Sequence, residues 1–219
     1  MELSCRFLLC LLLSCTLHGQ SFDSRPLSQP IWDPPNVFEE FPLGAKATVP
    51  KDMIKSLRVD GQRIVLETTE LVAIQKTVGG VIGNRGDAGE SLSWLCLHAS
   101  DSHGTWVLWL LSSEIDNGSV GGFRWQLVKN TTSFDSRCSA LSAKEGIVEL
   151  PTPVRLGMSK QEIVHTLGSP SFNTGNTLFY LHEHDLTLHN EPYTDMNTLT
   201  IMIRGNRVAA MEVWKSTTS

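Results

Sequence analysis

The chain has 219 residues, of which 41% are hydrophobic and 19% are charged, and its formal net charge is −5. This length and apolar content allow one large domain or two small ones, each with a hydrophobic core, and exclude a largely disordered chain. Acidic residues outnumber basic ones, so the chain lacks the basic surface that is typical of a general nucleic-acid-binding protein, and we expect no nucleic-acid partner.

Residues 1–19 have the layout of a secretory signal peptide. Arg6 precedes an apolar run at 7–13, which is shorter than the roughly 20 residues that a membrane-spanning helix needs. Two processing sites fit the pattern: ordinary cleavage after Gly19, or a lipoprotein signal in which Cys15 becomes the lipidated first residue. We therefore expect an exported protein of the periplasm or cell envelope, anchored to the outer membrane only if Cys15 carries a lipid.

Two of the five cysteines, Cys96 and Cys138, lie beyond the signal. An even number of cysteines in an oxidising compartment favours a disulfide between them. Such a bond would close a loop of about 40 residues and stabilise the fold by roughly 3–4 kcal/mol in the chain-entropy model. Two buried thiols are the alternative. Two cysteines alone cannot form a structural zinc site.

The elements after the signal begin with a proline-rich arm at 20–50, where proline disfavours helix interiors. A strand at 63–66 and a helix that ends at Gly79 come next. The pattern then predicts three antiparallel strands, at 91–98, 106–111 and 123–128.

A similar series follows a linker at 129–146. It contains a short strand at 147–150, a helix that begins after Ser159, and further strands, at 177–181, 186–188, 198–203 and 208–214. We predict an α+β fold with two related helix-plus-antiparallel-sheet modules in tandem, the first at 51–138 and the second at 139–219.

A motif surrounds the helix of the second module. Gly157 permits a tight entry, Ser159 and Glu162 have the spacing of a capping box, and Gly168 supplies a left-handed stop. Met158 can pack onto the helix, and a proline prevents the helix from continuing. The residues of the motif are Gly157, Met158, Ser159, Glu162, Ile163, Leu167, Gly168 and Pro170, followed by Tyr180 on the next strand.

This motif resembles the SmpA/OmlA family, whose fold is that of the outer-membrane assembly lipoprotein BamE. The resemblance covers most of the second module, whereas the first module is only faintly similar. Two such modules in tandem are similar in outline to the beta-lactamase inhibitor protein. The resemblance implies a periplasmic protein that binds other proteins. A role in barrel assembly does not follow from it, because Cys15 is far from the motif in the sequence.

The most distinctive polar cluster contains His182 and His184, which alternate on a predicted strand and therefore share one face. With His189 nearby, three imidazoles can hold a metal ion. The alternative is a polar strand face at a sheet edge, and we name no cofactor. The sequence has neither a His-Glu-x-x-His nor a Gly-x-Ser-x-Gly motif, so it does not support a zincin or a serine hydrolase elbow.

Four tryptophans, Trp94, Trp106, Trp109 and Trp125, fall on successive predicted strands. They fit either the core of a sheet or an exposed aromatic face for a partner. Trp106 and Trp109 have opposite parity on a regular strand, so only one of them faces a given side.

The sequence therefore predicts a non-enzymatic, exported cell-envelope protein that acts through protein-protein contacts. One alternative is a metal-binding or hydrolytic enzyme that uses the region of His182, His184 and His189. The other is a secreted enzyme inhibitor, which rests on the tandem-module analogy alone.

Overall fold

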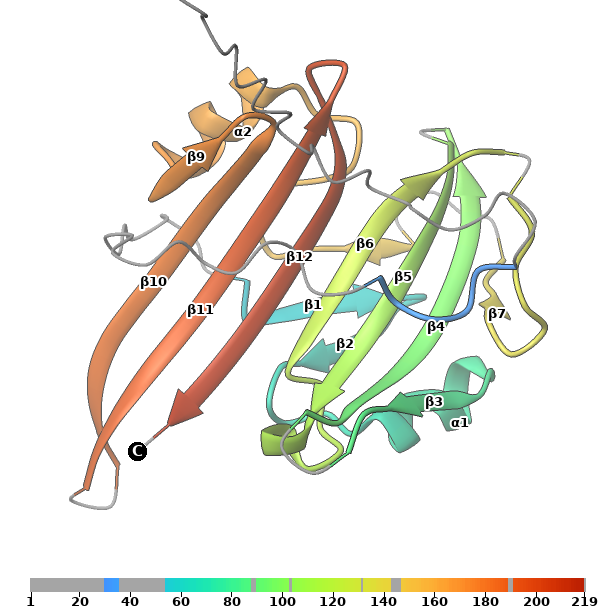
Figure 1. The fold of residues 1–219 in the computed structure, drawn as a ribbon, viewed down its shortest axis with the longest axis horizontal. Helices are drawn as coiled ribbons and strands as arrows, with labels where there is room; N and C mark the ends of the chain where they lie inside the picture. Colours follow the sequence, from blue (N-terminus) through green and yellow to red (C-terminus); the bar gives the residue numbers. More distant parts are fainter. Residues whose placement is uncertain are drawn as a thin grey trace, which may run out of the picture.

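The computed structural model describes residues 30–35, 54–87, 90–102, 104–130, 132–142, 147–188 and 191–218. Across these residues the chain is mostly antiparallel β-sheet, with one sheet of nine strands and one of three (Figure 1). The two α-helices of this described part have eight residues each, and neither is long and apolar enough to cross a membrane. They are α1 (Leu71–Val78) and α2 (Lys160–Leu167).

The large sheet has the order β3-β4-β5-β6-β12-β11-β10-β9, and β7 lies parallel to β4 outside this path. Its strands are β3 (Ile82–Arg85), β4 (Leu92–Asp101), β5 (Gly104–Ser113), β6 (Gly122–Val128), β7 (Ser139–Ala140), β9 (Phe172–Thr174), β10 (Thr177–Leu188), β11 (Glu191–Arg204) and β12 (Arg207–Thr218). The small sheet has the order β2-β1-β8. Its strands are β1 (Ser56–Val59), β2 (Gln62–Val65) and β8 (Val148–Glu149).

The predicted α+β class with tandem helix-plus-sheet modules is wrong, because the chain is largely β and its two halves share one sheet. The strands after α1 and the strands after α2 meet where β6 pairs with β12, from Gln126↔Ala210 to Gly122↔Trp214. Each helix is only two turns long and buries two side chains fully. Most of the burial therefore comes from the strands, and the helices cannot define separate modules.

Side chains of the large sheet form a hydrophobic cluster on each face, as alternation along strands requires. The larger cluster, the main core, lies between the sheet and a layer formed by the small sheet, α1 and α2. The smaller cluster, the disulfide core, lies on the opposite face. Its buried members are Ile31, Trp32, Trp94, Cys96, Val107, Trp109, Leu111 and Cys138.

The capping box predicted for α2 is confirmed. The Glu162 amide donates to Ser159 Oγ at 3.2 Å, and Glu162 Oε2 accepts from the Ser159 amide at 2.7 Å. Gly157 and Gly168 have φ values of 81° and 87°, which favour glycine. Met158 is buried, and its carbonyl oxygen accepts a hydrogen bond from the Val208 amide in β12 at 2.7 Å. These residues thus begin and end α2 and attach it to the large sheet.

Candidate functional site

One end of the large sheet extends past the region where β6 pairs with β12 (Figure 1). We name it the sheet extension, and define it as residues 182–188 of β10, 191–197 of β11 and 215–218 of β12. Its side chains point alternately to an inner face, which continues the main core, and to an outer face. The inner residues share the parity of Tyr180, Leu199 and Val213, which lie in the main core.

A network of charges occupies the inner face. Asp195 is 4% exposed, and its carboxylate lies 2.8 Å from Lys215 Nζ and 3.4 Å from Lys55 Nζ. Lys215 also pairs with Glu67, which accepts a hydrogen bond from Thr217 Oγ1 at 3.0 Å. Two lysines therefore balance two carboxylates, and the network ties β11 and β12 to the segments before β1 and before α1.

The network shifts the pKa values of Asp195 and Lys215. Burial opposes the charge of Asp195, but hydrogen bonds and attraction from Lys215 and Lys55 hold the pKa of this carboxyl below its usual value. Burial likewise opposes the charge of Lys215, but Asp195 and Glu67 raise its pKa above the ordinary value. Asp195 and Lys215 are therefore both charged at neutral pH.

His182 and His184 share the inner face, as the period of a strand predicts. Their rings lie 5.0 Å apart, and His182 Nε2 is 3.0 Å from His184 Nδ1. His184 Nδ1 is also 3.9 Å from Asp195 Oδ2. Burial, followed by the proximity of His184, lowers the pKa of His182. His189 lies outside the described residues. Among those described, no three His, Cys, Asp or Glu side chains converge as a metal centre.

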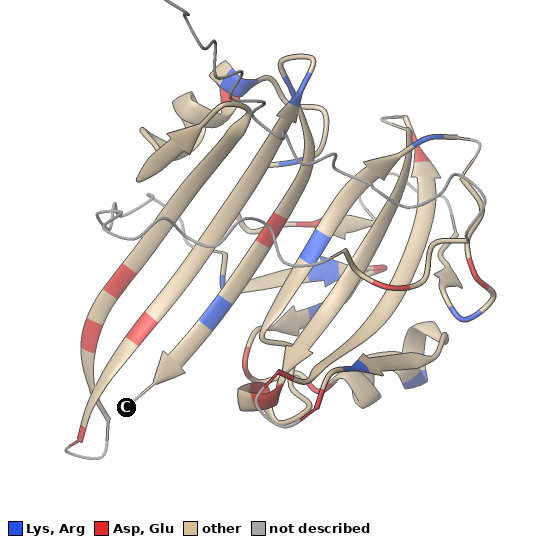
Figure 2. Ribbon diagram, in the orientation of Figure 1, with Lys and Arg blue, Asp and Glu red and all other residues tan. Residues whose placement is uncertain are grey.

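The outer face of the extension is part apolar and part acidic. Met196 is 40% exposed and lies in register between Glu183 on β10 and Ser216 on β12. Glu183 and Asp185 are also exposed. Figure 2 shows these acidic positions along β10 toward its hairpin end. Trp214, which is half-buried, comes next to this patch on β12.

Trp214 is held in one orientation by its neighbours. A Cβ on Gly122 would lie 2.7 Å from the Trp214 ring, so the indole packs directly on the backbone of β6. Its Nε1 donates to Glu212 Oε1 at 2.9 Å. Glu212 in turn forms a buried ion pair with Arg124 on β6, at 3.5 Å. The packing of Trp214 on Gly122 and the ion pair both cross the junction between the two halves of the sheet.

The four tryptophans predicted as a core or a binding face are all buried. Trp106 and Trp125 meet edge to face in the main core, with ring centroids 6.0 Å apart. Trp94 and Trp109 lie in the disulfide core. The four side chains therefore offer no exposed face, because a layer packs on each side of their strands. Trp214 is more exposed than these four tryptophans. The sequence indicated a partly polar strand face at this position, because the polar Glu212 lies on the same face of the strand.

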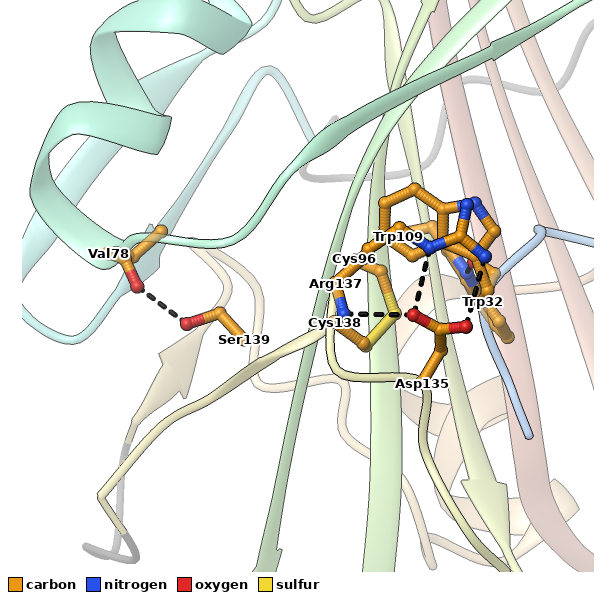
Figure 3. Close-up of a disulfide and its surroundings, with 8 residues drawn as sticks. All are labelled: Trp32, Val78, Cys96, Trp109, Asp135, Arg137, Cys138 and Ser139. Carbon is orange, nitrogen blue, oxygen red and sulfur yellow. Dashed lines mark hydrogen bonds and ion pairs between the residues drawn. A yellow bond between two sulfur atoms is a disulfide. The ribbon is translucent and has the colours of Figure 1, made fainter.

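The disulfide predicted between Cys96 and Cys138 is confirmed (Figure 3). Trp32 packs beside it, and the Trp32 carbonyl accepts a hydrogen bond from Trp109 Nε1 at 3.0 Å. The guanidinium of Arg137 lies 4.4 Å from the centroid of the Trp32 ring. This arrangement fixes the segment at 30–35 on the sheet and has a structural role. Cys15, the predicted lipidation position, lies outside the described residues.

Comparisons with protein-family models, with curated proteins and with solved structures found no match for the chain. The sheet extension and the disulfide therefore carry the functional inference.

Proposed function

We propose that this chain is an exported, non-enzymatic protein of the cell envelope that binds another protein through the outer face of the sheet extension and the adjoining Trp214. The proposal rests on the exposed Met196, which pairs with Ser216 and so lies diagonal to the oriented Trp214 on the neighbouring strand. Methionine and tryptophan are enriched at the centres of protein interfaces and charged residues are depleted there. A few buried anchors, with tryptophan prominent among them, commonly supply most of the binding energy.

The contacts of Trp214 support this role because they reduce the cost of binding. A side chain that is already fixed in the free protein loses little rotamer entropy when a partner covers it. Trp214 is fixed by its packing on Gly122 and by its hydrogen bond to Glu212. The paired strands of the extension hold the surrounding surface in register.

The charges around the patch indicate the chemistry of the partner. Glu183 and Asp185 lie on the same face as Met196, toward the hairpin end of β10. Charge complementarity speeds encounter and excludes partners of the wrong sign. We therefore expect a partner surface with an apolar side chain flanked by lysine or arginine.

Export is supported by the disulfide and by the signal-like residues 1–19. Disulfides persist in oxidising compartments and are rare in the cytosol. Cys96 and Cys138 are both buried and joined in the disulfide core. A binding protein that acts in the envelope benefits from such a cross-link, because the bond resists unfolding outside the reach of cytosolic chaperones.

Site-directed photo-crosslinking in the native host tests the proposal. A photoreactive amino acid replaces Met196 in one variant and Ile115, which is 74% exposed on the turn after β5, in the control. We expect a defined protein adduct at position 196 and none at position 115. The same adducts at both positions, or none at position 196, would refute a binding role for the outer face.

A purified partner then allows a quantitative check. Truncating or charging an interface anchor costs about 2 kcal/mol or more, so Met196→Asp is expected to weaken binding roughly 30-fold. Ile115→Asp serves as the matched control. If the partner is a hydrolase and is blocked stoichiometrically, the chain acts as an inhibitor. A structural partner without activity supports an assembly role instead.

A further inference from the structure

We infer that His182 and His184 form a two-nitrogen chelate for a divalent transition-metal ion on the inner face of the sheet extension. This inference is independent of the proposed protein-binding role, because Met196 on β11 and Trp214 on β12 face the opposite side of the large sheet. Imidazole nitrogen suits zinc, nickel and copper, and copper binds most tightly in the general order of affinities.

The spacing of the two nitrogens fits a shared ion. His182 Nε2 and His184 Nδ1 are 3.0 Å apart. With metal–nitrogen bonds of about 2.0–2.1 Å, two neighbouring ligands lie about 2.9 Å apart in square-planar and about 3.3 Å apart in tetrahedral geometry. The observed distance falls between these values, so an ion can replace the contact between the rings with little movement.

The strand keeps the two imidazoles in this arrangement. His182 pairs in register with Asn197 and His184 with Asp195, inside a ladder that continues to the end of β10. The remaining nitrogen of His182, Nδ1, is buried and has no hydrogen-bond partner among the described residues. Nε2 is therefore the nitrogen that His182 presents to an ion. Preorganised ligands of this kind reduce the entropic cost of binding.

The surrounding charges permit a cation. Lys55 and Lys215 are paired with Asp195 and Glu67, so these four groups together add no net positive charge beside the two histidines. The carboxylate of Asp195, 3.9 Å from His184 Nδ1, is the nearest anionic group to the chelate.

Access and ligand number define the kind of site. The His184 side chain is 43% exposed, so water can complete the coordination sphere. A chelate of two protein ligands with water in the other positions is open, whereas structural zinc sites use four protein ligands. We therefore expect reversible, exchangeable binding of one ion per chain.

Zinc titration of the tag-free chain by isothermal titration calorimetry tests the inference. The wild-type protein is expected to bind one Zn²⁺ ion, and His182→Ala and His184→Ala are each expected to lose this binding. His165→Ala is the matched control, because His165 is an exposed histidine on α2. It should bind zinc like the wild type. Circular dichroism verifies that all three variants are folded.

A second readout is the zinc-dependent rise in Tm, which follows when an ion binds the folded state only. The rise should appear in the wild type and in His165→Ala and be absent from the other two variants. Equal binding by all variants, a similar partial loss in all three, or no binding by the wild type would overturn the inference. Met196→Asp should keep the zinc site, so a failure of either proposal is distinguishable from a failure of the other.

Discussion

Removing the disulfide is expected to lower the free energy of unfolding by about 4 kcal/mol. The bond joins Cys96 to Cys138, which are 42 residues apart in the chain. For a loop of that length, the chain-entropy relation gives about 13 cal/mol/K, or about 4 kcal/mol at 25 °C. The double variant Cys96→Ala/Cys138→Ala removes the cross-link and keeps both Cβ atoms in the disulfide core.

Urea denaturation followed by tryptophan fluorescence measures this loss. The oxidised wild type is compared with the reduced wild type and with the double variant, and the latter two are expected to agree because both lack the bond. The m-value should rise in both, since an unfolded chain without the cross-link exposes more surface. Mass spectrometry of the intact protein confirms the redox state of each sample.

The chain-entropy relation predicts a much larger effect for a loop of this size, so a fall of less than about 1 kcal/mol in the free energy of unfolding, with an unchanged m-value, would refute the entropic reasoning. Single variants are less informative, because each leaves a buried free thiol. A wild-type protein that carries two free thiols when it is purified from an oxidising compartment would contradict the disulfide itself.

Three further predictions concern single contacts. Glu212→Ala removes the carboxylate that pairs with buried Arg124 and is expected to lower the free energy of unfolding in urea by about 3–5 kcal/mol. Adding Arg124→Met to this variant should restore part of the lost stability. If the losses of the two single variants simply add in the double variant, the ion pair is contradicted. Ser159→Ala is expected to lower the free energy of unfolding by about 1 kcal/mol, and Ser159→Thr by much less, because threonine keeps the hydroxyl that caps α2. Equal losses in the two variants would argue against this capping role. Burial raises the pKa of Tyr180 to about 12, so the neutral phenol stabilises the fold below pH 10 and this contribution is lost as pH rises through 12. Ultraviolet titration should show a tyrosinate phase near 12 that Tyr180→Phe removes, and its persistence would contradict the assignment.

Features with a local signal were predictable from the sequence. The capping box depends on two residues three positions apart, and the structure has both of its hydrogen bonds. The disulfide followed from the only two cysteines beyond the signal. The shared face of His182 and His184 followed from strand periodicity alone, because successive side chains of a strand point to opposite faces of the sheet.

The pairing of β6 with β12 was not predictable, because no local pattern specifies which strands meet across a long separation in the chain. The sheet extension also lacked a clear signal. In β10 the run from His182 to Asp185 is polar at every position, so hydrophobic alternation cannot assign its faces. The charge network on the inner face needs Lys55 and Glu67, which come from segments far from β11 in the sequence.

The position of β12 at the centre of the sheet has a consequence for the order of folding. β6 is synthesised long before β12, so the edge of β6 that pairs with β12 stays free until the ribosome has added the residues through Trp214. A nascent chain that folded early would present this edge to other chains, and open strand edges promote aggregation. Pairing across such a long separation is also slow. Translocation of the unfolded chain before it folds, as general secretion requires, would avoid that exposure.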